Sequence, residues 1–357
     1  MIPLPMTPLL VLPALAFLAT VILHVAALMI FPRLGLLDFP QRYGLSRPPI
    51  PYPTGVIAVA IFLIFFTVLH PLTTENLALL AGVILLAAVC MIDDRTFLSP
   101  RLRIVIQTLT ALLLALGGIR IDAVTNPLPG VWSDAGSLTL SSGWALGFSI
   151  VFTILWLLFT INALNWFDGI PGQVSTLSSI AFLTIGVLAL SERVNQPTLA
   201  LLSFILMGIS LAALLFDFPP PRVLMGDTGA MFFGLMIGIL TIYSGGKVAT
   251  AFLVLGVPLI DLLFVVLRRL RRGLSPLKGN ATDQHLHHRL LRRGWSPRHI
   301  ILLTAGIGAL FGITALFLGT WEKVGAGAVL LMVMVGLSWY SGTQTTHKTS
   351  LLPSGGG

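Results

Sequence analysis

Residues 143–172 read GWALGFSIVFTILWLLFTINALNWFDGIPG and join a membrane-like run to a polar end. Residues 143–161 are almost entirely apolar and approach the roughly 20 residues that a helix needs to cross a bilayer. Asn162, Asn165 and Asp168 follow at steps of three, which places them on neighbouring positions of one helix face. Because unpaired polar groups at a membrane boundary are costly, such side chains face a cavity, a ligand or water. The stretch predicts a membrane helix that ends in a polar site.

The whole chain has the composition of a membrane protein. Its 357 residues are 56% hydrophobic and 10% charged, with a mean hydropathy of +0.96. These values exclude a soluble globular domain and predict an all-α polytopic membrane protein, since spanning helices satisfy their own backbone hydrogen bonds. The net charge of +8 is assigned to loops that meet anionic lipid, so the bilayer is the expected partner and nucleic acid is not. Cys90, the single cysteine, excludes disulfides and cysteine metal sites.

Eleven apolar runs have about the length of a spanning helix. The first lacks a basic flank, so it is interpreted as a span and not as a cleaved signal peptide. The runs are 8–31, 54–71, 75–92, 102–120, 143–161, 173–191, 197–216, 228–246, 248–268, 299–319 and 323–341. We expect one transmembrane domain over residues 1–341, and a polar, glycine-rich tail at 342–357 that is disordered.

An odd number of spans places the two ends of the chain on opposite sides of the membrane. Five loops then share one side with the C-terminus, namely 32–53, 93–101, 162–172, 217–227 and 269–298. All Lys and Arg residues fall on that side except Arg120, Arg193, Lys247 and Lys323. Since positive charge concentrates in cytoplasmic loops, the five loops are predicted to be cytoplasmic and the N-terminus to lie outside.

Two acidic motifs lie in these loops. MIDDRTFLSPRLR (91–103) holds adjacent Asp93 and Asp94, which repel unless a cation or a proton lies between them. The alternative is a solvated loop in which Arg95 pairs with the acids. In NALNWFDGIPG (162–172) the amide and carboxylate oxygens suit a Mg²⁺ or nucleotide site, and Gly169 allows close approach to the backbone. The alternative is a helix C-cap that meets water.

Two further motifs complete the pattern. In GDTG (226–229), Asp227 precedes a span, where it is either a site residue near a helix N-terminus or simply an N-cap, as Thr228 is too. DQHLHHRLLRRG (283–294) groups histidines and arginines that suit phosphate oxygens; zinc ligation and a pH-dependent surface patch are alternatives. Asp261, inside a predicted span, could pair with an arginine or line a cavity, and this choice stays open. Acids, amides, histidines and arginines on one side indicate a metal and phosphate site.

These four motifs, in this order, resemble those of the polyprenyl-phosphate N-acetylhexosamine-1-phosphate transferases. The Asp-Asp pair is Asp93 and Asp94, followed by Leu98, Ser99, Arg101 and Arg103. The Asn-x-x-Asn-x-x-Asp-Gly motif is Asn162, Asn165, Asp168 and Gly169, and the Gly-Asp-x-Gly motif is Gly226, Asp227 and Gly229. The His-x-His-His motif is His285, His287 and His288, in a form similar to the bacterial undecaprenyl-phosphate GlcNAc-1-phosphate transferases. The resemblance covers about residues 32–300.

The resemblance implies a reaction and a set of roles. We expect Mg²⁺-dependent transfer of a sugar-1-phosphate, GlcNAc-1-phosphate above others, from a UDP-sugar to undecaprenyl phosphate, with release of UMP, at the cytoplasmic face of a bacterial inner membrane. This would be the first step of a cell-envelope glycan pathway; Mn²⁺ could replace Mg²⁺, and a homodimer is compatible with the family. The implied catalytic residues are Asp93, Asp94, Asp168 and Asp227, and the implied metal ligands are Asp227, Asn165 and Asp94. The implied substrate contacts are Asn162, Asn165, Gly169, Arg101, Arg103, Arg222, His285, His287, His288 and Arg289.

Three features depart from the family pattern. Pro171 stands where an acid or amide near the uracil is common, and Ala230 replaces a serine. The first loop, 36–55, lacks its usual Lys and His, and Thr54 replaces the first of a glycine pair at its end. The departures affect donor recognition more than metal chemistry, so MurNAc-pentapeptide is an alternative donor. A transporter or a scaffold protein is the alternative from another class. A transporter would place its polar groups near mid-membrane, whereas here they gather at span ends.

Overall fold

The computed structural model describes residues 6–40, 47–125, 137–140, 143–192, 194–245, 248–275 and 285–342. Most of this chain is helical: α1 (Met6–Arg33), α2 (Gly55–Leu69), α3 (Thr74–Thr96), α4 (Pro100–Leu116), α5 (Gly143–Phe167), α6 (Gln173–Leu190), α7 (Pro197–Asp217), α8 (Gly226–Tyr243), α9 (Val248–Val254), α10 (Gly256–Arg271), α11 (Leu286–Arg292), α12 (Pro297–Phe317) and α13 (Thr320–Gly342). Two short antiparallel strand pairs join β1 (Leu37–Asp38) to β2 (Ile50–Pro51) and β3 (Ala123–Thr125) to β4 (Ser137–Thr139). The all-α membrane class is confirmed.

Eight of the described helices are long and apolar enough to cross a membrane, namely α1, α3, α5, α6, α7, α8, α12 and α13. The predicted span 248–268 is instead two helices, α9 and α10, which meet at 86° and would make a ninth span if counted together. The predicted spans 54–71 and 102–120 correspond to α2 and α4, which are only 15 and 17 residues long. The count of eleven spans therefore stays a prediction.

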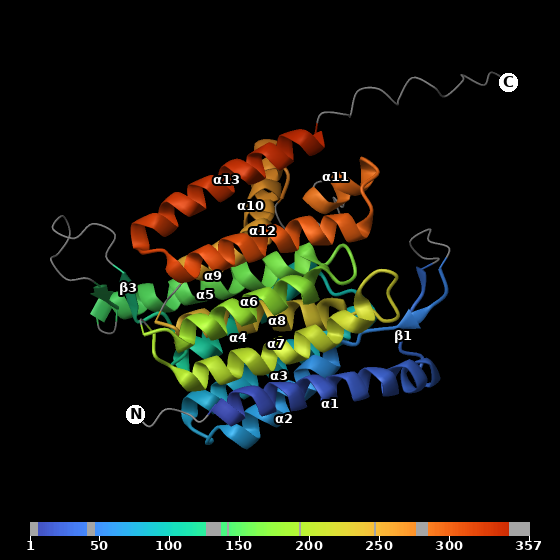
Figure 1. The fold of residues 1–357 in the computed structure, drawn as a ribbon, viewed down its shortest axis with the longest axis horizontal. Helices are drawn as coiled ribbons and strands as arrows, with labels where there is room; N and C mark the ends of the chain where they lie inside the picture. The colour runs from blue at the N-terminus through green and yellow to red at the C-terminus, as the bar shows by residue number, and fades with distance from the viewer. Residues whose placement is uncertain are drawn as a thin grey trace.

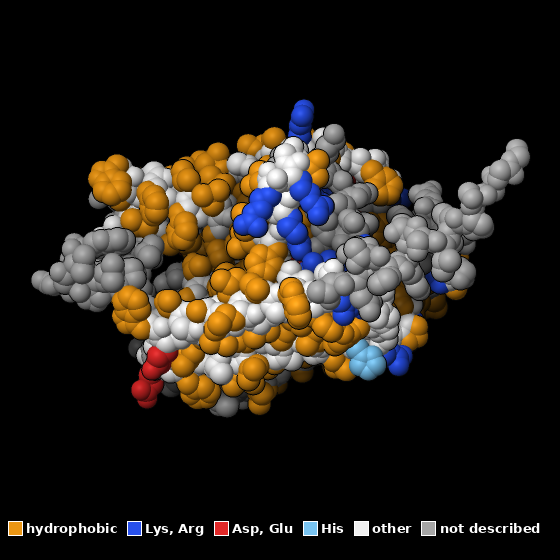
Figure 2. Space-filling view, turned by 90° about the horizontal axis from the view of Figure 1, so that it is seen from above, with side chains coloured by type: hydrophobic (Ala, Val, Ile, Leu, Met, Phe, Trp, Pro, Cys, Tyr) orange, Lys and Arg blue, Asp and Glu red, His pale blue; other side chains and the backbone are white. Residues whose placement is uncertain are grey.

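Most helices lie roughly horizontal in Figure 1, so its left and right edges are the two ends of the bundle. α1 begins at the left and α13 ends at the right, with β3 at the left end and β1 and α11 at the right. The described chain thus starts and finishes at opposite ends, as an odd number of spans requires. Figure 2 shows apolar side chains over most of one face, with Lys and Arg side chains gathered in one region of it.

Helix α8 is the centre of the bundle. It packs against α2, α3, α5 and α6, and all of its residues except Asp227 and Tyr243 are buried. Two of its glycines allow the contact with α5, because a Cβ on Gly234 would lie 2.7 Å from the Thr160 carbonyl oxygen and one on Gly238 would lie 2.7 Å from Thr160 Oγ1. Small residues let membrane helices approach closely where apolar side chains would hold them apart. The close packing brings the end of α5 beside the start of α8.

The polar loops are shorter than the sequence predicts. α3 extends to Thr96 and α5 to Phe167, so the predicted loops 93–101 and 162–172 begin within helices. Likewise the loop 217–227 starts on the last residue of α7 and ends in the first turn of α8, and the loop 269–298 contains α11. Four residues of the charge count, Arg42, Arg193, Lys247 and Lys278, and residues 343–357 of the tail lie outside the described residues.

Candidate active site

Side chains from four helices meet around Arg103 of α4. Arg103 Nε lies 3.0 Å from Asp93 Oδ2 of α3, and Arg103 Nη2 donates to Asp227 Oδ2 of α8. In the orientation that satisfies its neighbours, the Asn165 amide of α5 donates to Asp227 Oδ1 at 3.0 Å and accepts from Arg103 Nη2 at 2.9 Å. We call Asp93, Arg103, Asn165 and Asp227 the Arg103 cluster. It unites three of the four sequence motifs at one end of the bundle.

A tight turn between α3 and α4 brings Arg103 back to Asp93. Phe97 ends α3 in the left-handed conformation, with φ of +56°, and Asp93 Oδ1 accepts a hydrogen bond from Leu98 N at 2.6 Å. Ser99 then caps α4 by accepting from Leu102 N at 3.3 Å, and Pro100 occupies the first helical position. The run Leu-Ser-Pro is thus a helix-start signal, and it sets the register that places Arg103 in the site.

Asp94 holds the N-terminus of α8. Its Oδ1 accepts from Tyr52 Oη at 2.7 Å and from Asp227 N at 2.9 Å. Its Oδ2 accepts from Thr228 N at 3.1 Å and from Thr228 Oγ1 at 2.6 Å. Gly226 makes this approach possible, because a Cβ there would lie 2.9 Å from Asp94 Oδ2. An acid supplied by one helix therefore caps another, and the metal-ligand role implied for Asp94 stays a prediction.

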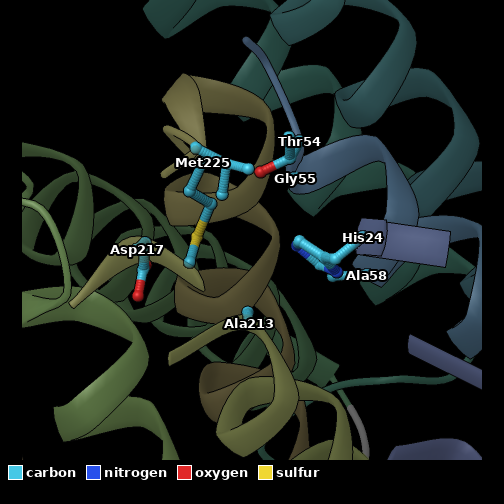
Figure 3. Close-up of a pocket in the computed structure, with 8 residues that line it drawn as sticks. His24, Thr54, Gly55, Ala58, Ala213, Asp217 and Met225 are labelled. Carbon is cyan, nitrogen blue, oxygen red and sulfur yellow. The ribbon is translucent and has the colours of Figure 1, made fainter. Parts of the chain in front are cut away.

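The end of the first loop packs against the segment that precedes α8. Thr54 N donates to the Leu224 carbonyl and Gly55 N to the Met225 carbonyl, each at 2.9 Å. A Cβ on Gly55 would lie 2.2 Å from the backbone nitrogen of Gly229, so only glycine fits there. The small closed pocket behind this contact, bordered by His24, Asp217 and Met225 in Figure 3, has no room for a water molecule. The start of α8 is thus packed from behind as well as capped.

Asp168 and Gly169 follow the end of α5. Burial raises the pKa of Asp168 well above its usual range, and the carboxylates of Asp217, Asp227 and Asp94 raise that pKa further. Such crowding of acids favours a bound cation or a retained proton. Gly169 makes room for the histidine motif, since a Cβ there would lie 2.0 Å from His287 Nε2.

The histidine motif is at the start of α11. His285 Nδ1 lies 2.9 Å from Asp261 Oδ2, and its ring stacks on His287 with centroids 5.6 Å apart. His287 is 2% exposed, and neither ring nitrogen has a hydrogen-bond partner among the described residues. Burial lowers the pKa of His287 well below its usual range, with His288 and His285 lowering that pKa further. A neutral, unpaired imidazole therefore lies directly against the Asp168–Gly169 turn.

Comparison with known proteins identifies this arrangement. Residues 76–245 match glycosyl transferase family 4. A relative from Pasteurella multocida (strain Pm70), an undecaprenyl-phosphate alpha-N-acetylglucosaminyl 1-phosphate transferase, is 31% identical over 323 residues, which cover 86% of each chain. The chain belongs to glycosyl transferase family 4. As a member of this polyprenyl-phosphate sugar-1-phosphate transferase family, it is an enzyme of the phosphotransferase type.

Two further relatives of the family 4 chain show the same likeness. A probable undecaprenyl-phosphate N-acetylglucosaminyl 1-phosphate transferase from Bacillus subtilis (strain 168) is 29% identical over 80% of this chain and 78% of its own. A decaprenyl-phosphate N-acetylglucosaminephosphotransferase from Mycolicibacterium smegmatis (strain ATCC 700084 / mc(2)155) is 29% identical over 85% of this chain and 82% of its own. The similarity covers most of the length of each relative, so the family assignment applies to nearly the whole chain.

Several expected substrate residues of the family 4 enzyme have other partners. Asn162 Nδ2 donates to Gln107 Oε1 at 2.7 Å and to the Leu158 carbonyl at 2.8 Å. Arg222 donates to the Leu215 carbonyl at 2.9 Å, and Arg289 donates to Ser338 Oγ of α13 at 2.9 Å. Arg101 is exposed near the start of α4. Outside the Arg103 cluster, these four residues keep their substrate roles only as predictions.

Two acids that the sequence did not assign hold elements of the site. Asp217, at the end of α7, accepts a hydrogen bond from Ser175 Oγ in the first turn of α6. Asp261 of α10 pairs with His285 and accepts from Leu286 N at 3.0 Å. An acid within or at the end of an apolar run indicates such a role in the sequence, because a buried acid needs a partner inside the protein. The sequence could not name the partner, because each lies on a distant helix.

The donor set of the family 4 site fits a hard divalent cation. No cluster of three or more His, Cys, Asp or Glu side chains with the spacing of metal ligands occurs among the described residues. Mg²⁺ does not need such a full set of protein ligands, because it commonly binds one or two carboxylates and completes its coordination shell with water and substrate phosphate. Asp227 and the crowded Asp168 supply that kind of partial set, and the Asn165 amide oxygen would join it by turning from Arg103. The residues present therefore fit Mg²⁺ bound jointly with a pyrophosphate.

Proposed function

We propose that the protein transfers GlcNAc-1-phosphate from UDP-GlcNAc to undecaprenyl phosphate with release of UMP. The reaction would need Mg²⁺ and would take place at the cytoplasmic face of a bacterial inner membrane, as the first step of a cell-envelope glycan. The named activities of the relatives support the sugar and the lipid. The observation that carries the proposal is the Arg103 cluster, which gathers two carboxylates, an amide and a guanidinium. A third carboxylate, that of Asp168, and the buried imidazole of His287 lie nearby.

Both substrates are anions, so binding them together is the first problem that the site must solve. The Arg103 guanidinium lies between Asp93 and Asp227 and can contact a phosphate oxygen without leaving the cluster. The neutral His287 ring beside Gly169 can donate one hydrogen bond and accept another. When bound, Mg²⁺ would neutralise charge on the pyrophosphate and polarise the phosphorus. Asp227, Asn165 and Asp168 would be the residues that hold it.

The group transfer itself exchanges one phosphorus–oxygen bond for another. An oxygen of the lipid phosphate bonds to the β-phosphorus of UDP-GlcNAc, and the bond from that phosphorus to the bridging oxygen breaks, so UMP leaves with that oxygen. Asp93 would orient the lipid phosphate or accept its remaining proton; its contact with Arg103 at 3.0 Å supports this role, since Arg103 would bind a phosphate oxygen. In-line geometry and charge balance then supply most of the catalysis.

Release of UMP by the purified protein in detergent tests this function. Undecaprenyl phosphate would be supplied with a panel of UDP-sugars, including UDP-GlcNAc and UDP-MurNAc-pentapeptide, with and without Mg²⁺. We expect UMP only when lipid, metal and UDP-GlcNAc are all present. Release with a different UDP-sugar alone would assign that sugar as the donor. The donor is the part of the proposal that Pro171 bears on most, since Pro171 departs from the family pattern. No release with any UDP-sugar would contradict the transferase function and favour a scaffold or transporter.

Replacement of Asp227 by Asn tests the site directly. Loss of one ligand charge should reduce turnover by at least 10²-fold, as removal of transition-state electrostatic contacts commonly does. The variant should elute and melt as a folded protein, since Asp227 is in the first turn of α8 and Asn also begins helices well. Near-normal turnover by Asp227→Asn would contradict the role of Asp227 as a metal ligand.

The orientation in the membrane can be tested with single cysteines in a Cys90→Ser background. Phe97, 69% exposed, lies at the end of the bundle that holds the Arg103 cluster, and Asp122 lies exposed beside β3 at the other end. An impermeant maleimide added to intact cells should label Asp122→Cys and not Phe97→Cys, and lysed cells should allow both to react. Labelling of Phe97→Cys in intact cells would reverse the proposed orientation.

A further inference from the structure

Asp261 is buried in α10, on the part of the chain that follows the 86° bend. It is 4% exposed, and both carboxylate oxygens are engaged: Oδ2 with His285 Nδ1 at 2.9 Å and Oδ1 with Leu286 N at 3.0 Å. Both contacts reach the first residues of α11, across 24 and 25 positions of sequence. A buried carboxylate would be costly without such partners, so the pair is a strong local constraint.

The His285 ring is held on three sides. Asp261 contacts Nδ1, His287 stacks on one face with an interplanar angle of 12°, and Trp166 of α5 meets the ring edge-on at 80° with centroids 5.5 Å apart. Trp166 is itself covered by the Arg269 guanidinium, 5.2 Å from its ring centre. The His285 ring is connected to the end of α5 in a second way, because His287, which stacks on it, lies against Gly169.

The carboxylate also decides where the proton of His285 lies. An ionised carboxylate only accepts hydrogen bonds, so a neutral His285 opposite Asp261 carries its proton on Nδ1 and leaves Nε2 as an acceptor. Any second proton must go on Nε2, where it can be donated to a phosphate oxygen. Orienting partners of this kind fix the tautomer of a functional histidine and commonly matter 10- to 100-fold when removed.

From this geometry we propose that Asp261 is a positioning residue of the transferase, which acts through His285 by fixing its tautomer and ring plane towards the phosphate groups of the sugar nucleotide. The inference rests on the proposed function for the identity of that substrate. Asp261 does not touch the substrate, and its second bond, to Leu286 N, holds the start of α11 in the same place. The carboxylate thus links the bent membrane helix to the histidine motif.

Steady-state kinetics of Asp261→Asn, His285→Ala and the double variant test the proposal. The amide keeps the size of the side chain but presents an NH₂ group to one of the two donors. We expect kcat to fall about 10- to 100-fold with KM for the UDP-sugar changed less than about threefold. The double variant should be no slower than His285→Ala alone, because the two residues act as one unit. Asp122→Asn, an exposed acid paired with Arg120 beside β3, is the matched control and should stay at the wild-type rate.

Two outcomes would overturn the proposal: a kcat of Asp261→Asn within about twofold of the wild type, or a double variant whose loss equals the product of the single losses. If Asp261→Asn fails to fold, ¹⁵N spectra of histidine-labelled wild-type protein provide a separate test, with the His285 signal assigned from His285→Ala. A proton on Nδ1 is expected, and a proton on Nε2 alone would contradict the proposal. These spectra need no substrate, so failure of the wild type to release UMP would end the proposed function and leave this test intact.

Discussion

The carboxylate of Asp94 accepts two hydrogen bonds from Thr228, one from the backbone nitrogen and one from the hydroxyl. The two residues are 134 positions apart in the sequence. Their contact joins the Asp-Asp motif on α3 to the Gly-Asp-Thr-Gly motif on α8. Since Asp227 lies between Gly226 and Thr228, this cap sets where its carboxylate points. Asp94 thus orients Asp227, while Asp93, the neighbour of Asp94 in the sequence, faces Arg103.

Replacing Thr228 with Val should weaken the cap that Asp94 provides and, through it, the reaction. The change keeps the shape of the side chain but removes a donor to a buried charge, which costs about 1.5–3 kcal/mol of folding free energy. We expect a melting temperature lower by several degrees and a lower kcat, because the start of α8 loosens around Asp227.

Mn²⁺ titration followed by electron paramagnetic resonance, in the presence of UDP-GlcNAc, compares the two acids of this motif pair. Asp94→Asn should keep Mn²⁺ affinity within about threefold if Asp94 acts as a cap, while Asp227→Asn should lose about tenfold or more. Equal losses in the two variants would instead make Asp94 a metal ligand, as the family resemblance implies.

Gly169→Ala is expected to block the site without unfolding the protein. Its Cβ would lie 2.0 Å from His287 Nε2, so the imidazole must turn away from the Asp168–Gly169 turn. Turnover should fall at least tenfold, by analogy with displaced orienting groups. Gly147→Ala in the same sequence run is the control, because no atom lies within 4 Å of a Cβ placed there. Unchanged kcat in Gly169→Ala would show that His287 has no fixed place in the reaction.

Asp168 should make the protein less stable as the pH rises. Its pKa is raised by burial and by neighbouring carboxylates, so above the usual pKa the folded protein still holds a proton that the unfolded chain has released. Stability then falls as the pH increases through the interval between the two pKa values. Asp168→Asn should therefore melt higher than the wild type at pH 7–8 and equally at about pH 4, while turnover is lost. Melting curves in detergent without divalent metal measure this; a lower melting point at pH 8 would contradict it.

Arg103 and Arg222 should differ sharply despite similar sequence expectations. Arg103 contacts Asp93, Asn165 and Asp227, whereas Arg222 donates to the Leu215 carbonyl and lies 4.8 Å from the Phe216 ring centre. Arg103→Ala should reduce kcat/KM by about 10²-fold or more, since it removes a cation between acids and phosphate. Arg222→Ala should stay within about threefold. Comparable losses in the two variants would mean that Arg222 turns into the site when substrate binds.

The sequence motifs predicted which side chains would gather. The structure shows which of them cap or hold helices and which face Arg103. Asp93, Asn165 and Asp227 were expected at one site, and they do meet. Sequence spacing could not show that Asp94 would bond to α8, that Arg289 would turn to Ser338, or that Asp261 would reach His285. Each of these depends on a partner in a distant segment, and periodicity within one helix contains no information about that partner.

The amino-acid sequence by itself determined the membrane class, the helical content and the identity of the polar motifs. The hydrocarbon core of a bilayer admits only segments that satisfy their own backbone hydrogen bonds. The length of the apolar runs is therefore sufficient to predict spanning helices. Only the tertiary structure decided that 248–268 bends into two helices and that Gly55 meets Gly229. It also decided which of the acids cap helices and which face Arg103. Those outcomes depend on side-chain and backbone contacts between segments far apart in the chain, whose free energies exist only once the helices have packed.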